Sequence, residues 1–274
     1  MRIALAQVSS GTDPAANAAL VADGVARAAA AKADLVVFPE ATMCRFGVPL
    51  GPVAQPVDGP WAQTVSTLAD QHRITVIAGM FTPAGSDSPG EATVRNRVHN
   101  TLLVAAPGQN RLSYNKIHLF DAFDFAESRT VAPGAELVTV DVAGITIGLA
   151  TCYDIRFPQL FTALADRGAA VSVVAASWGD GAGKLRQWRT LAAARALDTA
   201  GYVVAVGQAR PTEPEVARSP APTGIGHSVV ADPYGSIVFE AGDNEEFAVI
   251  DIDPSIVATA RDRLGVLANR QPIR

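Results

Sequence analysis

Residues Ile145–Leu160, ITIGLATCYDIRFPQL, are the stretch on which the interpretation of this sequence depends. They open with a run of apolar and β-branched residues, which predicts a buried strand. The chain then reaches Cys152, turns, and enters a predicted helix after Pro158. At such a strand-to-helix turn, free backbone N–H groups and the helix dipole favour a thiolate. Because free cysteine is also a common buried packing residue, this stretch alone leaves both a nucleophile and an inert thiol open.

The composition predicts one large domain or two small ones with a sizeable core. Of the 274 residues, 49% are hydrophobic and 18% are charged. Apolar runs stay shorter than the ~18 residues that a membrane span needs. The chain starts at once as a strand with no secretory leader, so we expect a cytoplasmic protein without a membrane partner. A net charge of -5 with no basic cluster argues against a nucleic-acid partner.

Cysteine and histidine usage predicts neither a metal site nor a cofactor. The two cysteines, Cys44 and Cys152, could form a disulfide, but thiols in a cytosolic protein stay reduced. The sequence has neither Cys-x-x-Cys nor His-Glu-x-x-His spacing. Its four histidines are scattered along the chain at His72, His99, His118 and His227.

The two halves of the chain show the same order of predicted elements, β-α-β-α-β-β-β. In the first half we expect them at residues 3–8, 14–32, 35–38, 58–72, 74–79, 98–106 and 111–114. Asp13 before Pro14 fits a helix N-cap, and Pro83–Glu91 reads as a surface loop. In the second half we expect them at 145–150, 158–167, 170–175, 185–200, 202–207, 228–231 and 236–239.

This repeated order predicts an α/β fold, a four-layer α-β-β-α sandwich. Fully apolar strands such as Leu35–Phe38 need cover on both faces, and two stacked sheets with helices on their outer sides provide it. The turn Asp232-Pro233-Tyr234-Gly235 suits a type I hairpin turn. We assign residues 1–253 to the sandwich, and residues 254–274 to a helix and tail that pack on it or on a partner subunit.

Three chemically active side chains follow predicted strands. Glu40 comes after Leu35–Pro39, Lys116 comes after residues 111–114, and Cys152 ends the strand described first. Strand ends at one edge of a sheet are where α/β proteins assemble sites. Taken singly, Glu40 could cap a turn and Lys116 could be a solvated loop lysine.

Together these residues lie in segments that resemble the three motifs of the nitrilase superfamily, the carbon–nitrogen hydrolases. The segments are Phe38-Pro39-Glu40, Tyr114–Phe120 (YNKIHLF) and Cys152–Pro158 (CYDIRFP). Glu127–Gly134 (ESRTVAPG) is similar to a fourth signature, and residues 194–198 and 226–228 match further family segments. The resemblance covers nearly the whole chain and implies the four-layer sandwich with a Glu-Lys-Cys triad.

The chemistry of an amide substrate fits these residue types. Hydrolysis needs a nucleophile, a base and a group that holds the oxyanion. Cys152 would attack the carbonyl and form a thioester, Glu40 would accept its proton, and Lys116 with the N–H of Tyr153 would stabilise the intermediate. By resemblance, Glu127 is a second carboxylate that positions substrate and water, and such crowding should perturb the pKa values.

Other residues near the motifs are open to two interpretations. Arg156 could bind a substrate carboxylate, although an ion pair with Asp154 or Asp198 is favoured over that role. Trp178 could form a wall of the pocket or belong to the core. Three further residues are expected to hydrogen-bond or pack rather than react: His118, His227 and Cys44.

Within the superfamily the motifs are most similar to the omega-amidase and deaminated-glutathione amidase branch, whose members hydrolyse amides of small carboxylic acids. Asn115 and Gln159 depart from that branch, which often has Arg and Glu there. A nitrilase, an N-carbamoyl hydrolase and, in another class, a non-catalytic metabolite-binding protein remain alternatives. The resemblance, and the apolar residues on several sides of helix 185–200, predict a homodimer or larger homo-oligomer.

Overall fold

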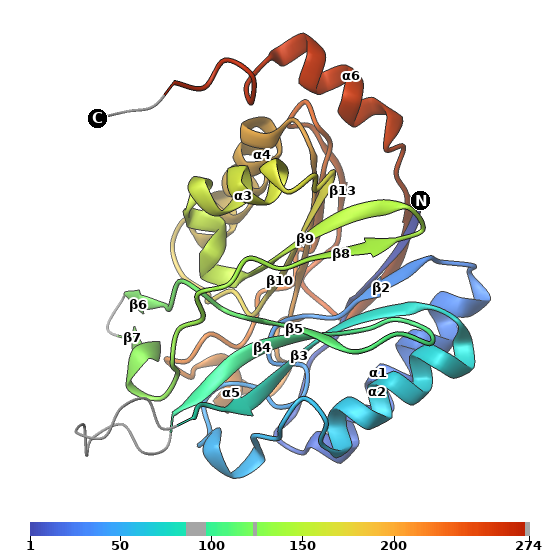
Figure 1. Cartoon of the computed structure of the whole chain (residues 1–274). Helices are drawn as coiled ribbons and strands as arrows, with labels where there is room; N and C mark the ends of the chain where they lie inside the picture. The colour runs from blue at the N-terminus through green and yellow to red at the C-terminus, as the bar shows by residue number, and fades with distance from the viewer. Residues whose placement is uncertain (86–96, 123–124, 272–274) are drawn as a thin grey trace.

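Two six-stranded sheets form the centre of the computed structural model, which describes residues 1–85, 97–122 and 125–271 (Figure 1). The first sheet has the order β14 (Glu246–Asp251), β1 (Arg2–Gln7), β2 (Leu35–Val37), β3 (Thr75–Pro83), β4 (Val98–Ala105) and β5 (Leu112–Asn115). The second sheet has the order β13 (Ile237–Glu240), β12 (Val229–Ala231), β11 (Tyr202–Gly207), β10 (Val171–Ala176), β9 (Ile145–Thr151) and β8 (Thr139–Val142). A small ribbon pairs β6 (Asp121–Ala122) with β7 (Phe125–Ala126).

Helices connect these strands. The α-helices are α1 (Pro14–Ala30), α2 (Pro60–His72), α3 (Pro158–Asp166), α4 (Lys184–Thr199), α5 (Pro214–Ala217) and α6 (Ser255–Leu264). The short 3₁₀ helices are η1 (Gly51–Val53), η2 (Glu127–Arg129) and η3 (Cys152–Arg156). Helices α1 and α2 lie on the outer face of the first sheet, and α3 and α4 on the outer face of the second (Figure 1).

The strands alternate between two cores, as a two-sided buried sheet requires. On β1, Ile3 and Leu5 pack between the sheets together with Ile147 of β9. Ala4 of β1 instead packs with the residues of α1 and α2, and Ala150 of β9 packs with those of α3 and α4. The predicted four-layer α-β-β-α sandwich is therefore confirmed.

Local signals placed most element boundaries within a few residues. Asp13 caps α1, because its Oδ1 accepts a hydrogen bond of 2.9 Å from Ala15 N, and Pro14 is the first helical residue. The Gly235 N–H donates to the Asp232 carbonyl at 2.9 Å, which closes the predicted turn between β12 and β13. Pro83 was expected in a loop but ends β3, whereas Ala84 and Gly85 lie outside any strand or helix as expected. Residues 86–91 of the expected loop lie outside the described residues.

The repeated β-α-β-α-β-β-β order is confirmed, and each sheet has one further strand. β14 lies antiparallel to β1, with Arg2 opposite Asp251 and Gln7 opposite Glu246, and β8 lies antiparallel to β9. Neither strand was predicted. Because β14 comes from the second half of the sequence, it joins the two halves through the first sheet.

The C-terminal helix α6 contacts the second half of the fold. Val257 packs into the core between the sheets, and the Arg261 guanidinium donates to the carbonyls of Ala169 and Thr199. Residues 272–274 of the expected tail lie outside the described residues. Within the part of the chain that the structure describes, no helix is both long and apolar enough to cross a membrane.

Strand β3 supports the loop that follows β2. A Cβ on Gly79 would lie 2.5 Å from Ala41 N and 2.7 Å from Pro39 O, closer than real contacts allow. Glycine therefore lets the backbone of Pro39–Ala41 lie directly on β3, where Met43 N donates to the Gly79 carbonyl. This contact fixes the backbone that carries Glu40.

Candidate active site

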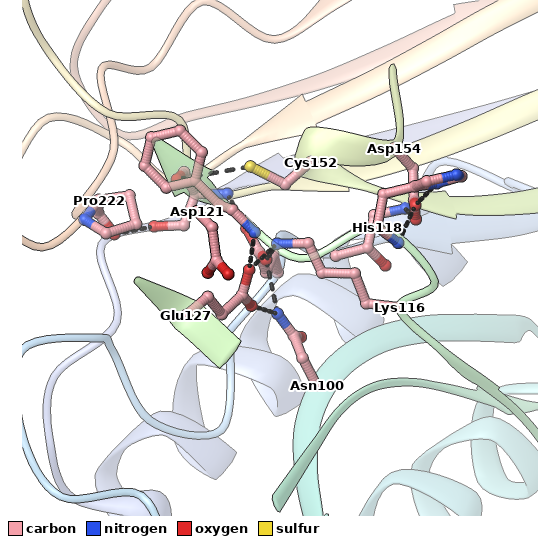
Figure 2. A network of polar contacts seen from close by, with 12 residues as sticks. Asn100, Lys116, His118, Asp121, Glu127, Cys152, Asp154 and Pro222 are labelled. Atoms are coloured by element: carbon pink, nitrogen blue, oxygen red, sulfur yellow. Dashed lines mark hydrogen bonds and ion pairs between the residues drawn. The ribbon is translucent and has the colours of Figure 1, made fainter. Parts of the chain in front are cut away.

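The three side chains predicted from the strand ends come together in the structure with Glu127, which the family resemblance implied. Glu40 follows β2, Lys116 follows β5, Glu127 begins η2, and Cys152 follows β9. All four are buried, with exposed fractions between 0% for Glu40 and 6% for Cys152. Figure 2 shows the Lys116 ammonium directed toward Glu127.

The Lys116 ammonium forms a buried ion pair with each of two carboxylates. Its Nζ lies 2.9 Å from Glu40 Oε1 and 2.9 Å from Glu127 Oε2. Burial opposes its charge, but the two carboxylates outweigh burial and hold the pKa of Lys116 well above its usual value. Lys116 is therefore protonated at neutral pH. Two of its N–H groups donate to the carboxylates, and the third can donate a hydrogen bond to another group in the site.

Glu40 accepts two further hydrogen bonds, and these leave one side of the carboxylate open. Asn100 Nδ2 donates to Oε1 at 2.7 Å, and the Ser177 N–H donates to Oε2 at 2.7 Å. Oε1 thus accepts hydrogen bonds from both Lys116 and Asn100. Among the described residues Oε2 accepts only the one from Ser177, so it can accept a further hydrogen bond. Burial, followed by the charge of Glu127, raises the pKa of Glu40 against the opposing effect of Lys116.

Glu127 is held in a similar way. Its Oε2 accepts the Phe120 N–H at 2.7 Å in addition to the Lys116 ammonium, and its Oε1 accepts Asn100 Nδ2 at 3.0 Å. The carboxylate is buried and fixed in orientation by these donors. Glu40 and Glu127 therefore lie side by side, sharing one lysine and one asparagine.

Cys152 lies at the first residue of η3 in an unusual backbone conformation. Its φ of +47° falls in the left-handed region, which costs a non-glycine residue roughly 1–3 kcal/mol and occurs at functional sites. The Sγ–H donates to the Ser177 carbonyl at 3.7 Å. Burial and the neighbouring Glu40 raise the pKa of Cys152 well above its usual value. The strand-to-helix turn favours a thiolate, but burial and Glu40 oppose it, so that a base such as Glu40 would have to accept the thiol proton.

Asp154 connects the turn at Cys152 to the segment around Lys116. Its Oδ2 accepts the Tyr114 hydroxyl at 2.6 Å and the Thr151 N–H at 2.9 Å. Its Oδ1 accepts the backbone N–H and the ring Nδ1–H of His118, at 2.9 and 2.7 Å. Because Tyr114 and His118 flank Lys116, this buried carboxylate fixes the two segments relative to each other.

A small pocket opens onto the thiol. Its cavity volume is only about 10 Å³, far below the roughly 300–1,000 Å³ of cavities that hold drug-sized ligands. The residues that line it are Phe120, Cys152, Tyr153, Arg156, Ser177, Trp178, Gly179, Lys184 and Pro222. The predicted substrate-binding residues Tyr153, Arg156 and Trp178 all lie here, and Trp178 also packs on Trp188 of the core.

Arg156 does not form the ion pair that was favoured for it. Its Nη2 donates to Gln187 Oε1 at 2.7 Å, and within the described residues it has no acidic partner. Asp154 is already saturated by its four donors, and Asp198 pairs with Arg195 at 2.8 Å. The Arg156 guanidinium instead lies 5.1 Å from the Trp178 ring centroid, at the pocket.

Two residues of the site were missed. Lys184, the first residue of α4, lines the pocket, with its Nζ 5.2 Å from the Phe120 ring centroid. Burial, and then the charge of Arg156, lowers the pKa of Lys184. Asn100 is the other, and a signal existed for it: a polar amide inside the apolar strand 98–106 is uncommon.

The residues expected to be structural have structural contacts. His227 Nδ1 bonds Glu240 Oε1 at 2.9 Å. Cys44 is fully buried, its Sγ–H donates to the Thr12 carbonyl at 3.5 Å, and it does not line the pocket. Across residues 1–85, 97–122 and 125–271, no three or more His, Cys, Asp or Glu side chains group as metal ligands would.

Comparisons with known proteins find close similarity over the whole chain. The sequence profile described as carbon-nitrogen hydrolase matches residues 2–262. The hydrolase Rv0480c of Mycobacterium tuberculosis is 57% identical over 98% of this chain and 95% of its own length. The deaminated glutathione amidase of Escherichia coli O157:H7 is 34% identical over 93% of this chain and 91% of its own. The crystal structure of Saccharomyces cerevisiae Nit3, described as a member of branch 10 of the nitrilase superfamily, superposes with a TM-score of 0.81 at 28% identity, over 96% of this chain and 93% of that one.

The Asp154 contacts generate a stability prediction. In Asp154→Asn one oxygen becomes an NH₂ group that faces two donors, so the free energy of unfolding should fall by about 1–3 kcal/mol. Urea denaturation measures the change. The matched control is Asp141→Asn, an exposed aspartate that accepts a hydrogen bond from Thr146, which should change stability by less than about 0.5 kcal/mol. Equal losses in the two variants would contradict the role given to Asp154.

Proposed function

The chain belongs to the carbon–nitrogen hydrolase family, and we propose that it hydrolyses the amide of a small carboxylic acid to an acid and ammonia. The observation that carries this proposal is the Cys152 thiol next to a buried Glu40–Lys116–Glu127 cluster. The similarity to relatives named deaminated glutathione amidase supports an amide as the substrate. The small size of the pocket supports a compact acyl group at the reacting carbon.

The first half of the reaction acylates Cys152. Glu40 Oε2, which keeps an open acceptor position, takes the thiol proton as the sulfur bonds to the amide carbon. The oxyanion forms against the third N–H of Lys116 and the N–H of Tyr153, which lies in the first turn of η3 where helix N–H groups have no carbonyl partner within the helix. Glu40 then gives the proton to the amide nitrogen and the C–N bond breaks. Ammonia departs, and the acyl group stays on Cys152 as a thioester.

The second half releases the acid. Glu40 takes a proton from water as the water oxygen attacks the thioester carbon, and the same N–H donors hold the second oxyanion. The C–S bond breaks and the sulfur recovers the proton from Glu40. Glu127 has a free acceptor position on Oε1 among the described residues, and it orients the substrate amide and then the water.

The charge of the pocket wall supports a substrate with a carboxylate of its own. Arg156 and Lys184 both line the pocket, and Arg156 Nε is buried without a hydrogen-bond partner among the described residues. A guanidinium edge offers paired N–H donors that match a carboxylate. We therefore place the far carboxylate of an omega-amide against Arg156, as in the first of the two roles considered for it.

A substrate screen tests the proposed function. The purified protein should release ammonia from amides of four- and five-carbon dicarboxylic acids faster than from neutral amides or nitriles of equal length. Cys152→Ala removes only the nucleophile, so it should unfold at a similar temperature and release no ammonia above the uncatalysed background. A folded Cys152→Ala variant with substantial turnover, or a wild type that hydrolyses none of the amides, would contradict the proposal.

Replacing Arg156 tests the carboxylate site. Arg156→Leu should raise KM for a carboxylate-bearing amide by about 10- to 100-fold, the effect of losing a charged hydrogen bond of about 1.5–3 kcal/mol. Steady-state kinetics on a neutral amide should show little change in the same variant. Arg189→Leu is the control, because Arg189 pairs with Glu240 on the surface and does not line the pocket. A similar rise in KM for the carboxylate-bearing and the neutral amide would contradict the proposal that Arg156 binds the substrate carboxylate.

A further inference from the structure

Asn100 on β4 contacts every charged member of the buried cluster. Its Nδ2 donates one hydrogen to Glu40 Oε1 at 2.7 Å and the other to Glu127 Oε1 at 3.0 Å. Its backbone carbonyl accepts the Lys116 N–H at 2.9 Å. Asn100 is 0% exposed, and Figure 2 shows its side chain directed at Glu127. One residue thus holds both carboxylates and the backbone of the lysine between them.

The orientation of the Asn100 amide is fixed by charge. If the amide were turned over, Oδ1 would face two carboxylate oxygens, so the NH₂ group must point toward them. As a result Oδ1 is buried without a partner in the described part of the chain. An unpaired buried acceptor destabilises the fold, because it has lost its hydrogen bonds to water without gaining another partner. Fold stability alone therefore gives no reason for an amide at this position. An amide is explained if the two carboxylates, Glu40 and Glu127, each need an N–H donor from the same residue.

A neutral hydrogen-bond donor at position 100 suits a basic Glu40 carboxylate better than a cationic or an apolar side chain would. Five groups face this carboxylate, each from a different part of the fold: Lys116, Glu127, Cys152, Asn100 and the Ser177 N–H. Burial and Glu127 raise the pKa of Glu40, and Lys116 and the Asn100 hydrogen bond lower it. A second cation would make the carboxylate a weak base, while an apolar residue would leave two carboxylates competing for one lysine.

We propose that Asn100 is a positioning residue that holds Glu40 and Glu127 side by side and keeps Glu40 ionised as the base for Cys152. It touches neither the thiol nor the substrate pocket, and it acts through Glu40. The inference rests on the role of base proposed for Glu40. It also predicts an effect on the thiol that needs no amide substrate to be seen.

The test is the rate of Cys152 alkylation by iodoacetamide as a function of pH, followed by peptide mass spectrometry to separate Cys152 from Cys44. In Asn100→Leu, which has a similar volume but no donor, the acidic limb of the profile should move to higher pH. Asn100→Asp, which keeps the shape and replaces a donor with a carboxyl group, should move it in the same direction and provides a second variant. Glu127→Gln removes a negative charge next to Glu40, so it should move the limb to lower pH.

The matched control is Thr101→Val on the same strand. Thr101 is buried and hydrogen-bonds Asn115 and Thr82, but it contacts neither carboxylate. This variant should lose stability without moving the limb. A limb unchanged in both Asn100 variants, or moved equally in Thr101→Val, would overturn the inference. Because alkylation requires no turnover, a shift in the predicted direction supports the role of Asn100 even if the substrate screen finds no amidase activity.

Discussion

The structure of the site depends on one buried lysine shared between two carboxylates. Each of these charges would cost several kcal/mol to bury alone, and removing one partner of such a pair typically costs about 3–5 kcal/mol. The cluster is tolerable because Lys116, Glu40 and Glu127 are buried together and the two carboxylates accept further hydrogen bonds from Asn100, Phe120 N and Ser177 N. Asn100 lies on β4 of the first sheet, whereas Ser177 directly follows β10 of the second sheet. The site therefore requires that the two halves of the sandwich be assembled.

The same cluster explains why Cys152 is a neutral thiol at rest. One ammonium faces two carboxylates, and a thiolate would add a third negative charge to a buried site. The pKa values of Glu40 and Cys152 are both raised, which favours a state with one proton between them. In the proposed mechanism, the transfer of this proton is the first step. The left-handed backbone at Cys152, held by the Asp154 contacts, places the sulfur next to that base.

The sequence predicted the layers, the repeated order of elements and the residues at the strand ends, because periodicity, capping and motif positions are local. It did not predict β14, whose partner β1 lies at the other end of the chain. Nor did it place Arg156 correctly, since the two acids expected to pair with it, Asp154 and Asp198, are engaged by other residues. The contacts of Asn100 and Lys184 depend on three-dimensional packing between segments. A polar amide in an apolar strand marked Asn100 as unusual, but the sequence did not indicate which groups either residue contacts.

The central claim is that Cys152 forms a covalent bond to the acyl group of its substrate. The most direct measurement is acid quenching within the first turnover of an omega-amide, with ammonia and protein mass determined on the same sample. The account predicts a burst of ammonia matched by a mass increase equal to the acyl group, located on the peptide that contains Cys152. A burst of ammonia without any adduct, or an adduct on another residue, would contradict it.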